Sequence, residues 1–506
     1  MKGDFSRDSH NQSKQYSRVL MQQGRVQLDA DWNEQAALLL QAHRQSLADQ
    51  MGGHGTWTDE DRTEDATAFR VSLDADGDLV IGDGHYYVAG VRCFNESPFK
   101  IKGDTAAHFA AEALLAQEDN QVCLIYLDVW ERFVSHLEDN AIREVALGGA
   151  DSSGRTQITW QVKGINITPI DGDDDDEKIQ NALEGLKHTR ATLRARARHD
   201  NGTRPKTDAD PGDLHCNKPL DTGFRGLENS LYRVEIDNWL ANGDLNQSDT
   251  KTRVRFKWSR DNGSVAFPVK SISGNDSSIV KFRHSSQDPF TLLEEGDTVE
   301  LIDPILELRS RTGVLQKVKQ IDRVDQSIVL EPLPEMADSG FTTLFNNSVQ
   351  LSGTGDRGFT LRRWDGVGEV HFDNSGPLPN GNPLPNRNTA QQHAVGDWKE
   401  PWFLLGADGV EIQFVLPEDA DPSADDAPYL RYRPGDHWLI PARTNIEDIL
   451  WNWKKVDDQG QEKEIPDNVP PHGILDDYAP LATVKRSPGG LEAPIEKRRV
   501  LKRQTL

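Results

Sequence analysis

The stretch QVCLIYLDVWERFV, residues 121–134, constrains the fold of this chain more than any other segment. Its long apolar run predicts a strand that is buried on both faces. Just upstream, LVIGDGHYYVAGVRCFN, residues 79–95, predicts a β-hairpin region with glycines at its bends. From residue 223 onward, short segments that alternate apolar and polar residues predict further strands, including a small antiparallel barrel at about 293–333.

Two predicted helices interrupt this β pattern. From Asp31 to Met51 apolar positions recur every three or four residues and Gly52-Gly53 follow, which predicts an amphipathic helix with a glycine stop. Residues 171–200 begin with the acidic inset DGDDDDEK and end with arginines, an order that suits the dipole of a long solvated helix. We therefore expect a mainly β, multidomain protein with an N-terminal amphipathic helix, a central charged helix, and small antiparallel β barrels or sandwiches.

The chain has 506 residues, more than a single hydrophobic core usually organises. Composition shifts and loop-like segments predict seven consecutive parts. These are an N-terminal arm and capped helix (1–56), a first β domain (57–170), a charged helix and linker (171–222), a β domain with the small barrel (223–336), β segments with long loops (337–428), a C-terminal β module (429–486) and a basic tail (487–506).

Charge and cysteine content exclude several classes of function. A net charge of -25 repels phosphate backbones, so we expect no nucleic-acid partner. Cys93, Cys123 and Cys216 are widely spaced, which leaves neither a disulfide framework nor a Cys-x-x-Cys site. The polar start MKGDFSRDSHNQSKQ lacks the apolar region of a signal peptide, so we expect assembly in the cytoplasm, with membrane contact left open.

The segment GRVQLDADWNEQ, residues 24–35, places three carboxylates ahead of the first helix. Asp31 and Glu34 have the spacing of a capping box, with Asp in place of Ser or Thr. The alternative is cation binding, but a hard-metal site needs six or more oxygens and no dense loop of ligands surrounds these residues. We expect Asp31 and Glu34, with Arg25 and Trp32, to form a capped helix and assembly arm.

Motifs of catalysis are weak throughout the chain. Residues 353–358 satisfy G-x-G-x-x-G, but the strand-like FTLRRW follows, whereas a dinucleotide site must open a helix. Residues 74–78, DADGD, differ from a calcium loop because the glycine is misplaced and the twelfth position is His85, so we expect a hairpin turn. We expect no catalytic residue, cofactor or metal; a pair of carboxylates for glycoside hydrolysis stays open, because its defining separation is spatial.

The last twenty residues, SPGGLEAPIEKRRVLKRQTL, are basic on an otherwise acidic chain. This segment is either a disordered tail or a docking peptide that orders on an acidic partner surface. The residues that would carry the docking are Lys497, Arg498, Arg499, Lys502 and Arg503. The twelve tryptophans are also unusual; they fit core anchors, sugar stacking or a permanent interface.

Six longer motifs resemble a bacterial family encoded beside phage-tail-like contractile injection systems. They are MKGDFSRDS, YSRVLMQQGRVQLDADWNEQ, LDVWERFVSHLEDNAIREVALGG, FKWSRDNGSV, YRPGDHWLIPART and PPHGILDDYAPLA. The second motif is similar to the opening of other baseplate-associated proteins of such particles.

This resemblance implies a structural component of the injection particle, at the baseplate or in a shell or cage around the spike. Its partners would be other baseplate, spike or sheath subunits and further copies of itself, in a three-fold or six-fold homo-oligomer. Residues 16–35 would lie against a neighbouring subunit or against the chain's own first β domain. The alternatives are a module that binds envelope glycan or peptidoglycan, or a hydrolase that the particle carries.

Overall fold

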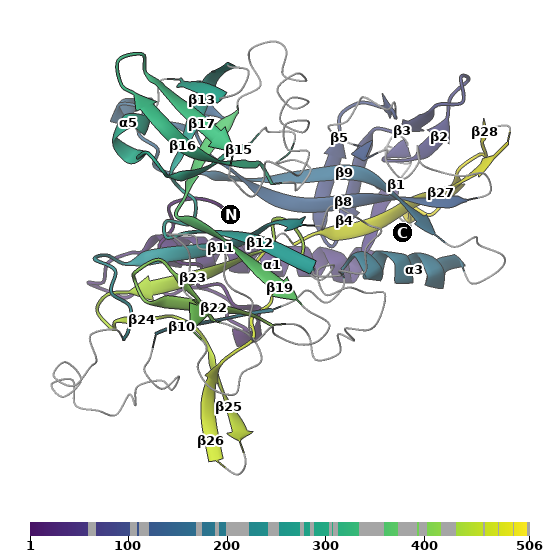
Figure 1. Cartoon of the computed structure of the whole chain (residues 1–506). Coiled ribbons are helices and arrows are strands. Elements are labelled where there is room, and N and C mark those ends of the chain that lie inside the picture. Colours follow the sequence, from purple (N-terminus) through teal and green to yellow (C-terminus); the bar gives the residue numbers. More distant parts are fainter. Residues whose placement is uncertain are drawn as a thin grey trace. The chain divides into compact units, whose positions relative to one another are not determined.

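The structure is a computed structural model, and its described residues form two compact units (Figure 1). Unit 1 combines residues 1–7, 133–155 and 189–474, and unit 2 combines residues 8–132, 156–188 and 475–506. The described residues are 1–58, 67–101, 109–110, 121–167, 175–187, 192–198, 222–240, 252–273, 278–283, 288–302, 306, 312–332, 359–372, 392–393, 402–415, 432–458, 461–473, 475–488 and 490–502.

The two units do not follow the seven predicted consecutive parts, because strands far apart in the chain pair with one another. Within the predicted module 429–486, β23 (His437–Arg443) pairs with β11 (Ser230–Leu240) in unit 1. In the same module, β27 (Asp477–Ser487) pairs with β8 (Val122–Val134) in unit 2. Backbone hydrogen bonding therefore assigns each strand to its unit, whatever the local composition.

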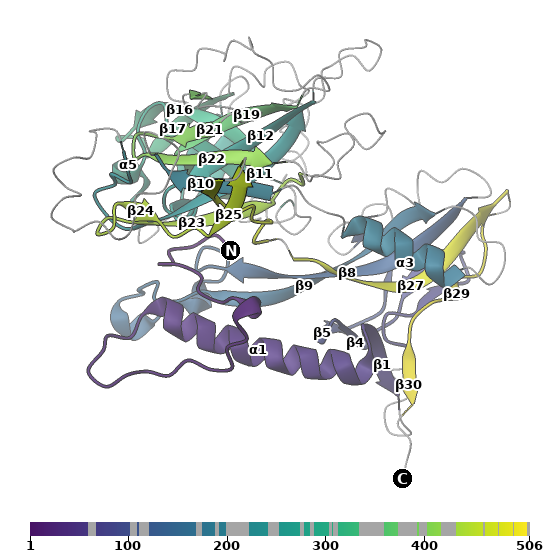
Figure 2. The same cartoon turned by 90° about the horizontal axis from the view of Figure 1, so that it is seen from below.

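The largest sheet of unit 2 is built around β8. Its strand order is β28 (Gly490–Leu491), β27, β8, β9 (Arg155–Ile167) and β7 (Phe109–Ala110), with β29 (Ile495–Glu496) also paired to β27. On one face of β8, Cys123, Ile125 and Leu127 enter the main core of the unit. On the other face, Leu124 and Tyr126 pack against the helix α3 (Asp175–Leu186), which Figure 2 shows against β8 and β27. Burial on both faces of this strand is thus confirmed.

Two smaller sheets complete unit 2. One has the order β30 (Val500–Lys502), β1 (His54–Thr58), β4 (Gly84–Val88) and β5 (Val91–Asn95); the other has the order β2 (Val71–Leu73), β3 (Leu79–Ile81) and β6 (Phe99–Lys100). The predicted hairpin is confirmed as β4 and β5, joined at Ala89-Gly90. Gly90 has φ +77°, and a Cβ there would lie 2.2 Å from the carbonyl oxygen of Arg44 in helix α1 (Asp29–Met51). Only glycine fits this close approach.

Unit 1 contains two sheets, a closed barrel and a hairpin. The first sheet has the strand order β19 (Gly366–Phe372), β12 (Thr252–Ser259), β11, β23, β24 (Asp448–Ile449). The second sheet has the strand order β10 (Thr192–Ala197), β22 (Val410–Val415), β21 (Trp402–Leu405), β20 (Gln392–His393). The barrel order is β13 (Ala266–Ser273), β14 (Ser278–Phe282), β17 (Ser327–Pro332), β16 (Val314–Asp322), β15 (Thr298–Ile302), β18 (Thr360–Trp364). The hairpin is β25 (Trp453–Asp458) and β26 (Gln461–Pro466), which extends away from the sheets of its unit (Figure 1).

The predicted barrel exists, but it starts earlier and ends later than residues 293–333. β18 closes it by pairing with both β13 and β15. Its sequence, within FTLRRW, is the strand that ruled out the dinucleotide fingerprint, and residues 353–358 themselves lie outside the described residues. Closure pairs both edges of the sheet, which removes the unpaired strands that an open sheet would expose.

The central charged helix also exists, but it ends at Leu186 and not near residue 200. Arg194 and Arg196 lie on β10, which pairs with β22. Arg196 is buried: its Nε donates to Glu411 at 2.8 Å, and its guanidinium lies 3.9 Å from the ring centre of Trp402. The basic end of the predicted helix is therefore a strand, because partners distant in sequence bury its arginine.

We expect Ile179→Ala to destabilise the protein by about 2–5 kcal/mol, since Ile179 is 5% exposed in the apolar contact between α3 and β8. The matched control is Glu177→Ala on the exposed face of the same helix, which should change stability by at most about 0.5 kcal/mol. Urea unfolding followed by circular dichroism measures both. Equal midpoints for the two variants would contradict the packing of α3.

Candidate assembly surface

An ionic core lies inside unit 1. We use this name for the six charged residues Arg233, Glu235, Asp237, Arg255, Lys257 and Glu300, each at most 4% exposed. Charged and apolar residues alternate along β11 and β12, so that one face of the sheet is charged. Tyr232, Val234 and Phe256 on the opposite face pack into the apolar core. The sheet thus buries both an apolar face and a charged face.

Direct contacts neutralise the ionic core. Lys257, with no exposed surface, has its Nζ 2.7 Å from Glu300, 3.3 Å from Glu235 and 3.4 Å from Asp237. Arg233 pairs with Glu235 at 2.6 Å, and Arg255 pairs with Asp237 at 2.5 Å. Burying a charge without such partners costs several kcal/mol, so each member depends on the others.

The barrel closes over this charged face. Glu300 lies on β15, and its carboxylate accepts hydrogen bonds from Trp364 Nε1 at 2.9 Å and from the Gly313 backbone N–H at 2.7 Å. Lys257 Nζ also lies 4.7 Å from the ring centre of Trp364, where the π face attracts a cation. Sheet and barrel are therefore joined by charged and aromatic groups that have little freedom to slide.

Burial alone would raise the pKa of both glutamates, but neighbouring cations outweigh it. Lys2, Arg233 and Lys257 hold the pKa of Glu235 well below its usual range, and Lys257 and Lys2 lower the pKa of Glu300 to about 2. Burial, with the nearby Arg233, holds the pKa of His437 well below its usual range. Both glutamates are therefore ionised near neutral pH, and His437 is uncharged.

Residues 1–3 fit against the ionic core. Lys2 Nζ lies 3.1 Å from Glu235 Oε1. The carbonyl oxygens of Met1 and Gly3 accept from Asn262 Nδ2 at 3.0 and 2.9 Å. The first and fourth family-like motifs, MKGDFSRDS and FKWSRDNGSV, are thus in direct contact.

The sequence analysis did not predict the ionic core. The alternation of charged and apolar residues in LYRVEID and TRVRFKW was a signal that could have predicted it.

The segment 8–28, which we call the arm, leads into α1 (Figure 2). Three hydrogen bonds hold it to the helix: Val19 N–H donates to Gln35 Oε1 at 2.8 Å, and Ser9 Oγ donates to Glu34 Oε2 at 2.6 Å and to the Ala30 carbonyl at 3.5 Å. The predicted arm and helix are therefore present. Glu34 binds the arm and does not cap the helix.

The capping box is displaced by three residues from its predicted position. The helix begins at Asp29, so Asp31 is the third helical residue and not the N-cap. Its carboxylate accepts from the Leu28 backbone N–H at 3.4 Å, which is half of a capping box. Leu28 has no side-chain acceptor to supply the other half. An apolar residue at the cap was not foreseeable from cap preferences.

The helix α1 is only partly covered by its own chain. Only Ala30, Leu38 and Met51 are buried among its 23 residues. Arg44 of α1 forms a bidentate ion pair with Glu131 of β8, with N–O distances of 2.9 and 2.7 Å. This pair holds the helix against β8 within unit 2. The N-terminal half of the helix exposes large apolar side chains, with Trp32 at 69% and Leu39 at 61%, whereas exposed residues further along, such as Gln45 and Asp49, are polar. The predicted assembly residues Trp32 and Arg25 are thus both on the surface.

The arm also exposes apolar side chains. Its exposed apolar residues are Tyr16, Leu20, Met21, Val26 and Leu28. Within the described ranges neither Arg18 nor Arg25 forms an ion pair. A contiguous exposed apolar patch marks an interaction surface far more often than scattered apolar residues do.

The basic tail contacts its own chain over the residues that the structure describes. Over residues 490–502 it is ordered: β30 pairs in parallel with β1, and the Arg499 carbonyl accepts from the Thr56 N–H at 3.0 Å. Arg498 is buried between Glu496 and the Ala68 carbonyl, and Lys497 lies 3.6 Å from Asp176 of α3. Lys502 belongs to β30, whereas its side chain and Arg503 lie outside the described residues.

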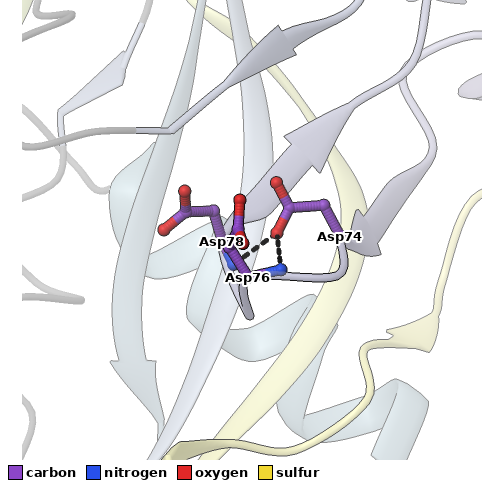
Figure 3. A group of neighbouring side chains, drawn as sticks. All are labelled: Asp74, Asp76 and Asp78. Atoms are coloured by element: carbon purple, nitrogen blue, oxygen red, sulfur yellow. Dashed lines mark hydrogen bonds between the residues drawn. The ribbon is translucent and has the colours of Figure 1, made fainter.

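Asp74, Asp76 and Asp78 form a cluster in which one oxygen from each lies within 4.8 Å of the others (Figure 3). They occupy the turn between β2 and β3, as predicted, and Asp74 accepts from the backbone N–H groups of Asp76 and Asp78 at 2.9 Å. The ammonium of Lys100 pairs with Asp74 and lies 3.6 Å from Asp76 and 3.8 Å from Asp78. Lys100 therefore balances charge where a cation would bind.

The described part of the chain is a β-rich protein of two units, with the ionic core buried in unit 1 and exposed apolar side chains on the arm and on the N-terminal half of α1. Cys93 and Cys123 are buried and free, and Cys216 lies outside the described residues. None of the helices in the described ranges combines the length and apolar character needed to cross a bilayer.

The sequence matches a family of unknown function (DUF6519) over residues 1–197 and 164–376. Because these regions span more than half of the chain, it belongs to that family. No curated protein is significantly similar in sequence. Among solved structures, the crystal structure of TssK aligns with 70% of this chain and 98% of its own, at 10% identity and a TM-score of 0.14. A likeness of that size carries no argument about fold or function.

We expect Lys257→Met to destabilise the protein by about 3–5 kcal/mol, because it leaves three buried carboxylates without their shared cation. The matched variant Lys2→Met should cost clearly less, since Glu235 keeps Arg233 and Lys257. Urea unfolding followed by tryptophan fluorescence measures both, with Trp364 as a local reporter. Equal losses would contradict the central place of Lys257.

Acid should destabilise the protein in two stages. Unfolding frees His437 to take up a proton below pH of about 6.5, so stability falls with pH from that value. Glu235 and Glu300 stay ionised in the folded state, whereas in the unfolded chain they protonate near pH of about 4.3, so a steeper loss follows down to a pH of about 2. Thermal unfolding across this range measures the effect. His437→Gln should flatten the first stage only; an unchanged profile would contradict it.

Proposed function

We propose that this chain is a structural subunit of a phage-tail-like contractile injection particle, located at the baseplate or in a shell or cage around the spike. It acts through assembly with other subunits and with copies of itself, and it catalyses no reaction. Assembly takes place in the cytoplasm. The single observation that carries the proposal is the apolar surface formed by the arm and the uncovered side of α1.

The positions of the family-like motifs support a structural role. FKWSRDNGSV contributes Lys257 and Asn262 to the ionic core and its contact with residues 1–3, while YRPGDHWLIPART contributes Trp438, which is fully buried. LDVWERFVSHLEDNAIREVALGG contributes Glu131, the partner of Arg44. These motif residues make contacts that stabilise the fold. A catalytic motif would place its polar groups around a cleft.

The exposure of α1 gives a second line of support. A helix of 23 residues with three buried side chains gains little from its own chain, and packing of an apolar face is the main source of helix stability in proteins. Trp32 and Leu39 are seven residues apart, which places them on the same side of the helix. Covering that side with a neighbouring subunit would supply the missing burial.

The second candidate function is recognition of envelope glycan, which the exposed Trp32 favours because sugars stack on flat aromatic faces. In that case cell-wall fragments should quench the fluorescence of the wild-type protein, and Trp32→Ala should abolish the change. If the protein acts only by assembly with other subunits, saccharide should not change its fluorescence.

The decisive experiment compares injection particles from the native host with particles from a strain that lacks this gene. We expect electron cryomicroscopy to show density for this subunit at the baseplate end, which disappears in the deletion strain while sheath and tube remain. Complementation with the wild-type gene should restore the density. Identical particles from the two strains would contradict the proposed function.

A further inference from the structure

We propose that the arm of one copy binds the β8–β9 loop of a second copy, in a head-to-tail contact. The β8–β9 loop comprises residues 135–154, between the two long strands. This inference deepens the proposed function by naming the partner of the arm. It rests on two exposed surfaces of the same chain that match in apolar character and are opposite in charge.

The arm supplies the basic surface. Residues 8–28 contain Lys14, Arg18 and Arg25 against the single acid Asp8, a net charge of +2. Leu20 is 69% exposed and Val26 is 81% exposed, so apolar and cationic groups are interleaved along the segment. The guanidinium groups of Arg18 and Arg25 have no ion-pair partner in the described part of the chain.

The β8–β9 loop supplies an acidic surface with an apolar tip. It carries four acidic residues against one arginine. Two short 3₁₀ turns, Asn140–Ile142 and Val145–Leu147, shape it, and Asp139 and Glu144 cap them by accepting from the N–H groups two residues ahead at 2.9 Å. These caps satisfy backbone donors but leave both carboxylate charges without a counter-ion among the described residues.

The tip of this loop exposes two apolar side chains within a single turn. Val145 is 85% exposed and Leu147 is 67% exposed. Both lie in the single turn Val145–Leu147, which ends at Gly148 with a left-handed backbone. A fixed turn presents these side chains without a large ordering cost on binding, which favours their use as contact residues.

Charge complementarity identifies the occupant as another copy of this chain. The protein carries -25 in total, so the rest of the molecule carries -25 - 2 = -27 once the arm is set apart. A second copy therefore attracts the arm, and the loop tip of that copy offers the apolar residues that bury Leu20 and Val26.

A contact between two different surfaces of the same protein has a geometric consequence. Each copy offers one arm and one loop, so contacts propagate and close into a ring when the rotation between copies allows it. A three-fold or six-fold ring is the form that the proposed place in the particle requires. A two-fold dimer, in which each arm binds the loop of the other copy, satisfies the same contacts, and the mass of the wild-type assembly distinguishes it from a ring.

Mass photometry of the full-length protein over a concentration series tests the contact. Arg18→Glu with Arg25→Glu forms the arm variant, and Val145→Ser with Leu147→Ser forms the loop variant. Each should raise the Kd for self-association by at least about tenfold, because each removes a central part of a small contact. Asp139→Asn with Glu144→Gln keeps both cap acceptors and should weaken association less at high salt than at low salt.

Mixing the arm variant with the loop variant provides the sharpest test. The intact arm of the loop variant can bind the intact loop of the arm variant, but the pair cannot extend. We therefore expect a 1:1 complex from two proteins that are monomeric alone. Circular dichroism checks that both variants are folded. A monomeric wild-type protein, or a mixture without the 1:1 complex, overturns the inference.

These outcomes separate the inference from the proposed function. If the subunit is present in purified particles but the mixture gives no complex, the function stands and the arm–loop contact is wrong. If the mixture gives the complex but particles lack the subunit, the contact stands and the proposed function is wrong.

Discussion

Lys257 is the residue on which the rest of unit 1 depends. Its ammonium group has no access to solvent and is shared by three carboxylates, two from the sheet and one from the barrel. Removing a charge from water costs several kcal/mol, and only well-placed opposite charges offset that cost. The barrel therefore has one favourable position on the sheet, whereas an apolar contact would tolerate sliding. Residues 1–3 extend the same network through Lys2 and Asn262.

This arrangement divides charge between two uses. Inside unit 1, charges of opposite sign face each other at hydrogen-bond distance and specify how the parts of the unit pack. At the surface, Arg18 and Arg25 of the arm and Asp139 and Glu144 of the β8–β9 loop have no ion-pair partner among the described residues, and exposed apolar side chains lie on the same two segments. A protein that works by assembly needs both, since a subunit must hold its shape while its contact surfaces stay available.

The terminal segments show why charge patterns alone mislead. The basic tail has the composition of a segment that docks on an acidic partner, but its backbone pairs with β1 and Arg498 is buried among groups of the same unit. The arginines after α3 suit a helix C-terminus, but Arg196 is buried beside Glu411 and Trp402. In both cases a strand partner hundreds of residues away decided the outcome, and no local pattern reports such a partner.

Local chemistry in the sequence determined the strand character of residues 121–134, the hairpin at residues 79–95, the helix that ends at Met51, and the turn at residues 74–78. Side-chain periodicity and turn residues act over a few positions, so these features were readable without a structure. The division into two units, the closure of the barrel by β18 and the ionic core around Lys257 were decided only by the tertiary structure. They depend on pairing between distant strands and on burial, and burial is what turns an ordinary alternation of charges into a strong constraint.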